Sequence, residues 1–168
     1  MKYTIKNIIQ KLELLPHPEG GYYKQTYKSA GEIDLSSLGD RYPSKRSYST
    51  CIYFLLTSES FSAFHRIKQD EIWHFYDGSP ILLHIITESG NHTTHLIGRD
   101  IQNGEVPQFV VPGGVWFAAE AIDVNSYSLV GCTVAPGFEF EDFELKSKKE
   151  LITLFPEREE IISKLSRD

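Results

Sequence analysis

Short runs of alternating apolar and polar residues dominate the middle of the chain, from Gly21 to Val134. Clusters of turn-forming residues separate these runs, for example at residues 76–80 and 88–91. Side chains two apart in a strand share a face, and Gly, Asn, Asp and Pro end strands, so the pattern predicts many short antiparallel strands. The predicted strands cover residues 21–27, 49–57, 62–67, 71–76, 81–87, 93–98, 108–112, 115–119 and 127–134.

The N-terminal segment has a different period. Ile5, Ile8, Ile9 and Leu12 recur at helical spacing, which predicts a short amphipathic helix within residues 1–15. Pro16 is expected to end it.

The C-terminal segment, residues 146–168, also predicts helices. Ser147 and Glu150 form a capping box ahead of Leu151, and Pro156 suits the first turn of a second helix over residues 157–165.

Two connecting segments are less regular. Residues 29–47 follow neither period and are interpreted as a long loop between two strands. Residues 135–145 alternate phenylalanine with glutamate, which favours an edge segment with one buried face and solvent-facing carboxylates.

Length and composition fit one domain. The chain has 168 residues, of which 40% are hydrophobic, and a single core usually serves a chain of this size. We therefore expect one domain over residues 1–168, with the N-terminal helix in 1–15, a β-domain in 16–145 and C-terminal helices in 146–168.

Charge and cysteine content narrow the partners. A formal net charge of −6 argues against nucleic acid, because proteins that bind its phosphates concentrate Lys and Arg. Cys51 and Cys132 lie in apolar runs and are interpreted as buried, reduced thiols. Lysines interrupt the N-terminus and no apolar run has membrane-spanning length, so we expect no membrane partner and a cytoplasmic location.

The most informative motif runs from His65 to Gly78. His65, Glu71 and Gly78 are spaced as in the first metal-binding motif of cupins, but Ile67 stands where the second histidine belongs. In the second motif, Pro112 and Gly114 match, while Phe117 replaces the histidine ligand. The pattern is typical of a cupin pocket with half of its metal ligands missing.

Strand parity indicates which side chains share the pocket. If His65 points inward, so does Ile67; if Glu71 points inward, so do Trp73 and Phe75, while His74 points away. One histidine, one carboxylate and several aromatic rings indicate a small-molecule site. The candidate ligand-binding residues are Tyr53, Ile67, Trp73, Phe75, Phe117 and Tyr127.

The candidate catalytic residues are His65 and Glu71. A carboxylate within hydrogen-bond reach would orient the imidazole and raise its pKa, which suits a general base. A catalytic metal needs about three protein ligands, and the motif supplies two, so no cofactor is predicted. In the alternative, His65 and Glu71 hold a divalent metal with a further histidine, such as His74, His84, His92 or His95.

Beyond these motifs, the chain resembles a family of small single-domain cupins of unassigned function. The resemblance covers residues 15–27, 49–56, 64–78, 107–119 and 127–145. It implies an all-β cupin jelly roll, barrel or sandwich, with short N-terminal and C-terminal helices, and a homodimer. It also implies a likeness of fold to metal-independent dTDP-sugar 3,5-epimerases, whose base is a histidine on the strand equivalent to that of His65 and whose acid is a tyrosine. Tyr22, Tyr23, Tyr53 and Tyr127 are all open as that acid.

These observations leave three functions open. The first is a metal-independent epimerase or isomerase that uses His65 and Glu71 on a sugar-like or other small polar metabolite. The second is a non-catalytic module that binds or senses a metabolite in the same pocket. The third is a metal-dependent oxygenase or isomerase with an atypical ligand set.

Overall fold

The computed structural model describes residues 4–168, so the first three positions of the range predicted for the N-terminal helix lie outside it. The helices and 3-10 turns are α1 (Ile5–Leu12), α2 (Leu35–Leu38), η1 (Gly39–Arg41), η2 (Ile101–Asn103), η3 (Phe140–Asp142), α3 (Lys148–Leu154), η4 (Pro156–Arg158) and α4 (Glu159–Lys164). The strands are β1 (Leu15–Pro16), β2 (Tyr22–Lys28), β3 (Glu32–Ile33), β4 (Arg46–Ser47), β5 (Thr50–Thr57), β6 (Phe61–Arg66), β7 (Glu71–Gly78), β8 (Ile81–Ile86), β9 (His92–Ile97), β10 (Gln108–Val111), β11 (Trp116–Ala121), β12 (Tyr127–Val134) and β13 (Glu144–Leu145).

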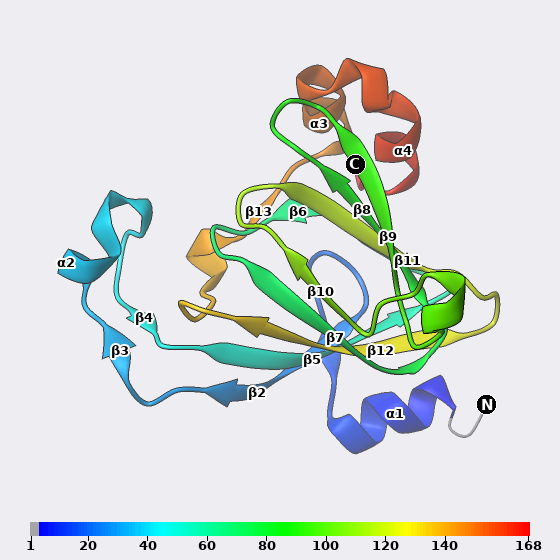
Figure 1. The fold of residues 1–168 in the computed structure, drawn as a ribbon, viewed down its shortest axis with the longest axis horizontal. Helices are drawn as coiled ribbons and strands as arrows, with labels where there is room; N and C mark the ends of the chain where they lie inside the picture. The colour runs from blue at the N-terminus through cyan, green and yellow to red at the C-terminus, as the bar shows by residue number, and fades with distance from the viewer. Residues whose placement is uncertain (1–3) are drawn as a thin grey trace.

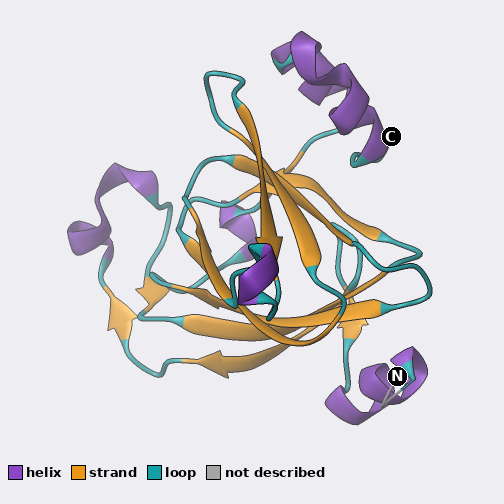
Figure 2. Cartoon of the chain, turned by 45° about the vertical axis from the view of Figure 1, so that its right-hand side comes forward, coloured by secondary structure: helices purple, strands orange, loops and turns teal. Residues whose placement is uncertain are grey.

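Two antiparallel sheets pack face to face and form a sandwich (Figure 1, Figure 2). One sheet has the order β1-β2-β5-β12-β7-β10, and the other has the order β13-β6-β11-β8-β9. The predicted all-β architecture with short terminal helices is confirmed, as a sandwich and not as a closed barrel.

Alternation along β11 shows how the sequence builds the layers. Phe117 and Ala119 face the core between the two sheets, whereas Trp116 and Ala118 face the opposite way. There they pack against apolar residues of the C-terminal segment, namely Leu151, Ile162 and Leu165. Helices α3 and α4 therefore cover the outer face of the five-stranded sheet.

Helix α1 covers part of the six-stranded sheet. Its N-cap, Thr4, accepts a hydrogen bond from the Asn7 N–H, and Ile8 packs against Leu55 and Tyr127. The amphipathic pattern at the N-terminus predicted this helix correctly, but Pro16 does not end it. The helix ends at Leu12, because Glu13 adopts a left-handed conformation, and Pro16 lies in β1.

The C-terminal helices differ slightly from prediction. The capping box of Ser147 and Glu150 forms as expected at the start of α3. Pro156 begins a 3-10 turn, and the α-helical part starts only at Glu159.

The long loop predicted over residues 29–47 is wrong. This segment contains a small sheet of β3 and β4, with α2 and η1 between them, and it projects from one side of the sandwich (Figure 1). Its last strand starts with Arg46, whose side chain is fully buried. These elements have only two to four residues each, which is too short for a helical or strand pattern of apolar residues to be recognised in the sequence.

The edge segment predicted over residues 135–145 is also corrected. Only Glu144–Leu145 forms a strand there, because the 3-10 turn η3 interrupts the alternation. The turn buries Asp142, which the pattern had left facing solvent.

In residues 4–168, no helix combines the length and the apolar character that crossing a bilayer requires.

Candidate functional site

A cavity of about 240 Å³ lies between the two sheets. Residues of β2, β5, β6, β7 and β12 form its walls, together with the segments that precede β2 and β13. It is lined by His17, Glu19, Tyr23, Gln25, Thr50, Ile52, Phe54, His65, Ile67, Glu71, Trp73, Cys132, Val134, Phe138, Glu139, Phe140 and Phe143.

Four of the predicted site residues reach this cavity. His65 and Ile67 come from β6 and the residue after it, while Glu71 and Trp73 come from β7. Strand parity therefore selected the correct faces of both strands. Phe117 lies directly behind His65, with the ring centroids 4.1 Å apart, and belongs to the core instead of the wall.

Three predicted residues lie away from the cavity. Tyr53 points outward because its neighbour Phe54 points inward, and its ring contacts Tyr76 on the outer face of the sheet. Phe75 has the predicted parity but packs against the core farther along β7 than the cavity extends. Tyr127 packs beneath α1, and its hydroxyl donates to Asp77 at 2.6 Å.

The partner of His65 is Glu19, which the sequence did not indicate. His65 Nε2 lies 3.0 Å from Glu19 Oε2, and both side chains are buried. On its other side, His65 Nδ1 lies 2.7 Å from the carbonyl oxygen of Ala63. A carbonyl only accepts hydrogen bonds, so Nδ1 carries the hydrogen and Nε2 faces Glu19.

One proton is therefore shared between His65 and Glu19. Burial lowers the pKa of His65 to about 3. Burial, reinforced by the charge of Glu71, raises the pKa of Glu19 well above its ordinary value, although the Ser62 hydroxyl donates to Glu19 Oε1 at 2.8 Å. Both shifts favour the neutral pair, in which the Glu19 carboxyl group donates its proton to Nε2 of His65.

A tight turn before β2 holds Glu19 in place. The backbone N–H of Ala63 in β6 donates to the Glu19 carbonyl at 2.9 Å. Gly20 follows at a φ of +115°, and a Cβ there would come within 2.1 Å of the Phe61 carbonyl oxygen. Only glycine permits this close approach, so the turn docks directly onto the strand that carries His65.

The same turn supplies a second buried histidine. His17 Nδ1 accepts a hydrogen bond from the Glu19 backbone N–H at 3.3 Å and lies 3.3 Å from Glu19 Oε2. Burial lowers the pKa of His17 to about 4, so this imidazole is neutral at neutral pH.

Glu71 lies on the other wall of the cavity. Burial raises its pKa to about 7, and interactions with the Cys132 thiol and the Trp73 indole offset this only in part. Nε1 of Trp73 is buried and, within the described residues, has no partner that meets hydrogen-bond geometry. Glu71 therefore changes its charge near neutral pH, and the Trp73 indole lies close enough to favour its ionised form.

The predicted hydrogen bond between His65 and Glu71 is wrong. Across residues 4–168, no hydrogen bond or ion pair joins them, because the chain crosses from one sheet to the other between β6 and β7. The two residues are close in sequence but stand on opposite walls of the sandwich.

The donor set does not fit the metal of a typical cupin site. Among the described residues, no three His, Cys, Asp or Glu side chains come together so as to hold a metal ion. Ile67 lies on the wall and Phe117 behind it, at the positions of the missing ligands. The histidines considered as a further ligand lie elsewhere: His74 contacts Thr133 on the outer face, His84 contacts His92, and His95 packs against Phe109.

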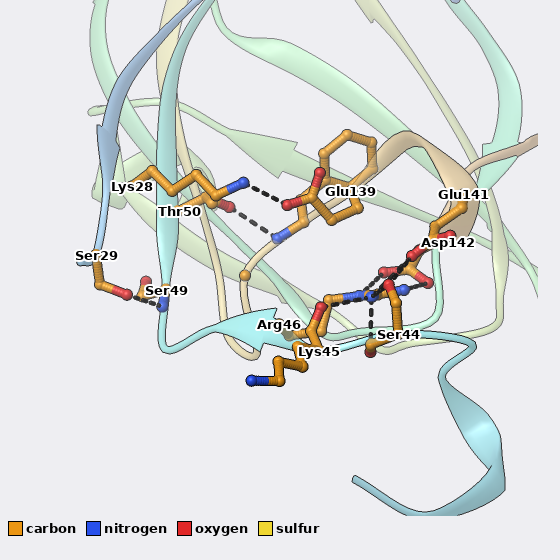
Figure 3. A network of polar contacts seen from close by, with 12 residues as sticks. Lys28, Ser29, Ser44, Lys45, Arg46, Ser49, Thr50, Glu139, Glu141 and Asp142 are labelled. Carbon is orange, nitrogen blue, oxygen red and sulfur yellow. Dashed lines mark hydrogen bonds and ion pairs between the residues drawn. The ribbon is translucent and has the colours of Figure 1, made fainter. Parts of the chain in front are cut away.

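The mouth of the cavity, which we define as Gln25, Glu139 and Phe140, consists of two exposed lining residues, Gln25 and Phe140, and the partly buried Glu139. Figure 3 shows how the segment that carries Glu139 is fastened: Lys28 pairs with Glu139, and Arg46 makes two 2.7 Å bonds to Asp142. The long segment 29–47 thus contributes to the site through Arg46, behind the mouth.

Sequence reasoning missed His17, Glu19 and the mouth. The local signal was the sequence from His17 to Gly21, in which a histidine and a glutamate precede two glycines. Such a turn can press acid and base side chains against a strand, but the strand it meets is far away in the sequence.

The sequence-family comparison identifies the fold family. The model of the cupin superfamily family DUF985 matches residues 6–146. The chain belongs to this family. An uncharacterized protein of Saccharomyces cerevisiae is 32% identical to this cupin over 158 residues, which cover 88% of this chain and 78% of the yeast protein.

Solved structures agree with this assignment. A hypothetical protein from Leishmania major superposes with a TM-score of 0.89 at 35% identity, covering 99% of this chain and 100% of its own. A protein from Shewanella oneidensis gives a TM-score of 0.89 at 39% identity, with 98% of each chain covered. Oxalate decarboxylase from Bacillus subtilis shares the fold alone, with a TM-score of 0.54 and 16% identity over 91% of this chain and 37% of the enzyme.

Proposed function

We propose that this cupin is a metal-independent isomerase or epimerase that moves a proton on a small, sugar-like or otherwise polar metabolite. The observation that carries the proposal is the placement of two proton-transfer groups on opposite walls of one cavity. Glu71, with a pKa of about 7, stands on the six-stranded sheet. The neutral Glu19–His65 pair stands on the five-stranded side.

Opposed groups suit inversion at a carbon next to a carbonyl. The Glu71 carboxylate takes the proton from that carbon, and the electron pair of the C–H bond moves to the carbonyl oxygen as an enolate forms. The Glu19–His65 pair then returns a proton to the opposite face of the carbon, and the carbonyl re-forms. Glu71 ends protonated and the pair ends without its proton, so exchange with water resets both.

In this mechanism, His65 and Glu71 have different roles from those expected from the sequence. His65 acts with Glu19, and Glu71 becomes an independent base. Of the four tyrosines considered as the acid, Tyr23 lines the cavity and is the alternative proton donor. The homodimer implied by the resemblance stays a prediction.

Solvent deuterium tests this function. The protein is incubated in D₂O with separate small aldoses, ketoses, amino sugars and hydroxyketones, and each compound is examined by mass spectrometry and NMR. We expect one carbon of a substrate to acquire deuterium, and Glu71→Gln and His65→Gln to abolish the exchange. His95→Gln, outside the cavity, is the matched control and should retain it.

Each other result has a definite meaning. Compounds that stabilise the protein without gaining deuterium would replace catalysis by the non-catalytic binding function. Stoichiometric iron, manganese, nickel or zinc that is lost on His65→Ala substitution would overturn metal independence. Exchange that persists in Glu71→Gln would remove Glu71 from the mechanism.

A further inference from the structure

The charge of the cavity points to the kind of ligand. Among the described residues that line it, three carry carboxyl groups, Glu19, Glu71 and Glu139, and none is lysine or arginine. The cations that bind the segment around the mouth are already paired: Lys28 with Glu139, and Arg46 with Asp142. A phosphate or carboxylate would therefore enter without a counter-charge and close to carboxyl groups, which is unfavourable.

Hydrogen-bonding capacity points in the same direction. The ionised carboxylates of Glu71 and Glu139 only accept hydrogen bonds. The donors in the lining are neutral groups, such as the Tyr23 and Thr50 hydroxyls and the Trp73 indole N–H, which interacts with Glu71. Because the lining has carboxylate acceptors and no charged donor, it suits an ammonium group, which has a positive charge, three donors and no acceptor.

Aromatic rings complete the walls. Tyr23, Phe54 and Trp73 line the buried part, while Phe140 and Phe143 line the side nearer the mouth. Aromatic faces attract cations and also cover apolar rings or chains. Of neutral, anionic and cationic ligands, a cation gains from both the rings and the carboxylates.

We infer that the cavity binds a small primary amine in its protonated form, with the ammonium group at the Glu71 carboxylate and the apolar body between the aromatic rings. The inference rests on the proposed function only in that both assign the ligand to this cavity. It narrows the ligand class from polar metabolites in general to amines, and it disfavours phosphorylated and carboxylated compounds.

Binding of an amine should depend on pH. The ammonium group prefers ionised Glu71, whose pKa is about 7 in the free protein. Glu19 and Cys132 also interact with Glu71, and burial raises the pKa of both, which favours their neutral forms. Affinity should therefore rise by up to about tenfold per pH unit below pH 7 and level off above it.

The test uses three probes that differ mainly in charge: benzylammonium, benzyl alcohol and benzoate. Binding is followed by the indole N–H signals of the two tryptophans in ¹H–¹⁵N NMR spectra. Trp73 lines the cavity, whereas Trp116 packs between the other sheet and the C-terminal helices, so it is an internal control. Trp116→Phe assigns the two signals.

We expect benzylammonium to shift the Trp73 signal and not the Trp116 signal, with a millimolar dissociation constant typical of so few atoms. Benzyl alcohol should bind at least tenfold more weakly and benzoate not measurably. Glu71→Gln should weaken benzylammonium binding about tenfold at pH 8. Glu88→Gln, in the exposed turn between β8 and β9, should leave it unchanged.

Several outcomes would overturn the inference. Equal or tighter binding of benzyl alcohol would make the cavity a site for neutral ligands, and binding of benzoate would make it an anion site. The inference also fails if no probe moves the Trp73 signal, or if Glu71→Gln binds benzylammonium as well as the wild type. These results are distinct from failure of the proposed function, because deuterium exchange into a neutral substrate would survive all of them.

Discussion

Asp142 and Glu71 are both buried carboxyl groups, yet their surroundings shift their pKa values in opposite directions. Burial alone would raise the pKa of Asp142, but hydrogen bonds from Arg46 and Gln69 outweigh it and hold that pKa below its ordinary value. Glu71 has no such cation within residues 4–168, and burial raises its pKa to about 7. The paired carboxyl group stabilises the fold behind the mouth, whereas the unpaired one is free to exchange a proton or meet a cation.

Whether a buried carboxyl group is paired decides whether it can interact with a ligand. A buried charge that is fully paired has no capacity left for a ligand. A buried carboxyl group without a counter-ion weakens the fold when it ionises, and such perturbed groups gather at functional sites.

The largest effect is expected from Arg46→Met. The change leaves Asp142 buried without its principal partner, and removing one member of a buried ion pair costs about 3–5 kcal/mol. Urea unfolding at pH 7 measures the loss. Arg99→Met, which breaks the exposed pair of Arg99 with Asp77, is the matched control and should cost less than about 1 kcal/mol.

The pH dependence of Arg46→Met adds a second check. Because the folded pKa of Asp142 is lowered, the stability it contributes is present above its ordinary value of 3.8 and is lost as pH falls through the folded pKa. The gap between wild type and Arg46→Met should therefore narrow in acid. A gap that stays constant down to pH 3 would contradict the role assigned to Asp142.

Glu71→Gln should stabilise the protein at high pH, in contrast to the destabilising Arg46→Met. Between the ordinary pKa of 4.5 and the folded value of about 7, the folded protein binds more protons than the unfolded chain, so wild-type stability falls as pH rises. The variant avoids this loss and should be more stable than wild type at pH 8 by about 3 kcal/mol at most, with little difference at pH 4.5.

Unfolding in urea at both pH values decides this prediction. Glu88→Gln changes the same side chain in an exposed turn and should show no such pH-dependent gain. If Glu71→Gln is less stable than wild type at pH 8, the Glu71 carboxylate has a favourable partner and the contrast with Asp142 fails.

The fold and half of the site could be predicted from the sequence, because the alternation of side chains along a strand is a local pattern. Two-residue periodicity fixed which side of β6 carries His65 and which side of β7 carries Glu71. It could not reveal that the chain changes sheets between them, since periodicity reports the face of a strand and not its neighbours. The partnership of His65 with Glu19, and of Arg46 with Asp142, depends on segments far apart in the sequence.

A smaller effect is expected from Ser62→Ala. This change removes the hydroxyl that donates to Glu19 Oε1 and leaves a buried oxygen without that partner, which costs about 1–2 kcal/mol. Thermal or urea unfolding measures it. Ser89→Ala, in the exposed turn near Thr87, should stay within about 0.5 kcal/mol, and an equal loss in both variants would remove Ser62 from the support of Glu19.

The smallest effect on stability, and the sharpest separation of stability from binding, is expected from Lys28→Met at the mouth. Lys28 and Glu139 are both partly exposed, so their ion pair contributes less than about 1 kcal/mol. Without Lys28, however, Glu139 loses a competing cation, and its carboxylate becomes available to a positively charged ligand.

Benzylammonium should therefore bind Lys28→Met two- to threefold more tightly than wild type at low salt, and the gain should shrink as salt screens Glu139. NMR titration of the Trp73 signal measures it. Lys24→Met breaks another exposed pair, with Glu13, away from the cavity, and should change neither quantity. Weaker binding in Lys28→Met would mean that Lys28 attracts the ligand, which would reverse the sign of charge assigned to the mouth.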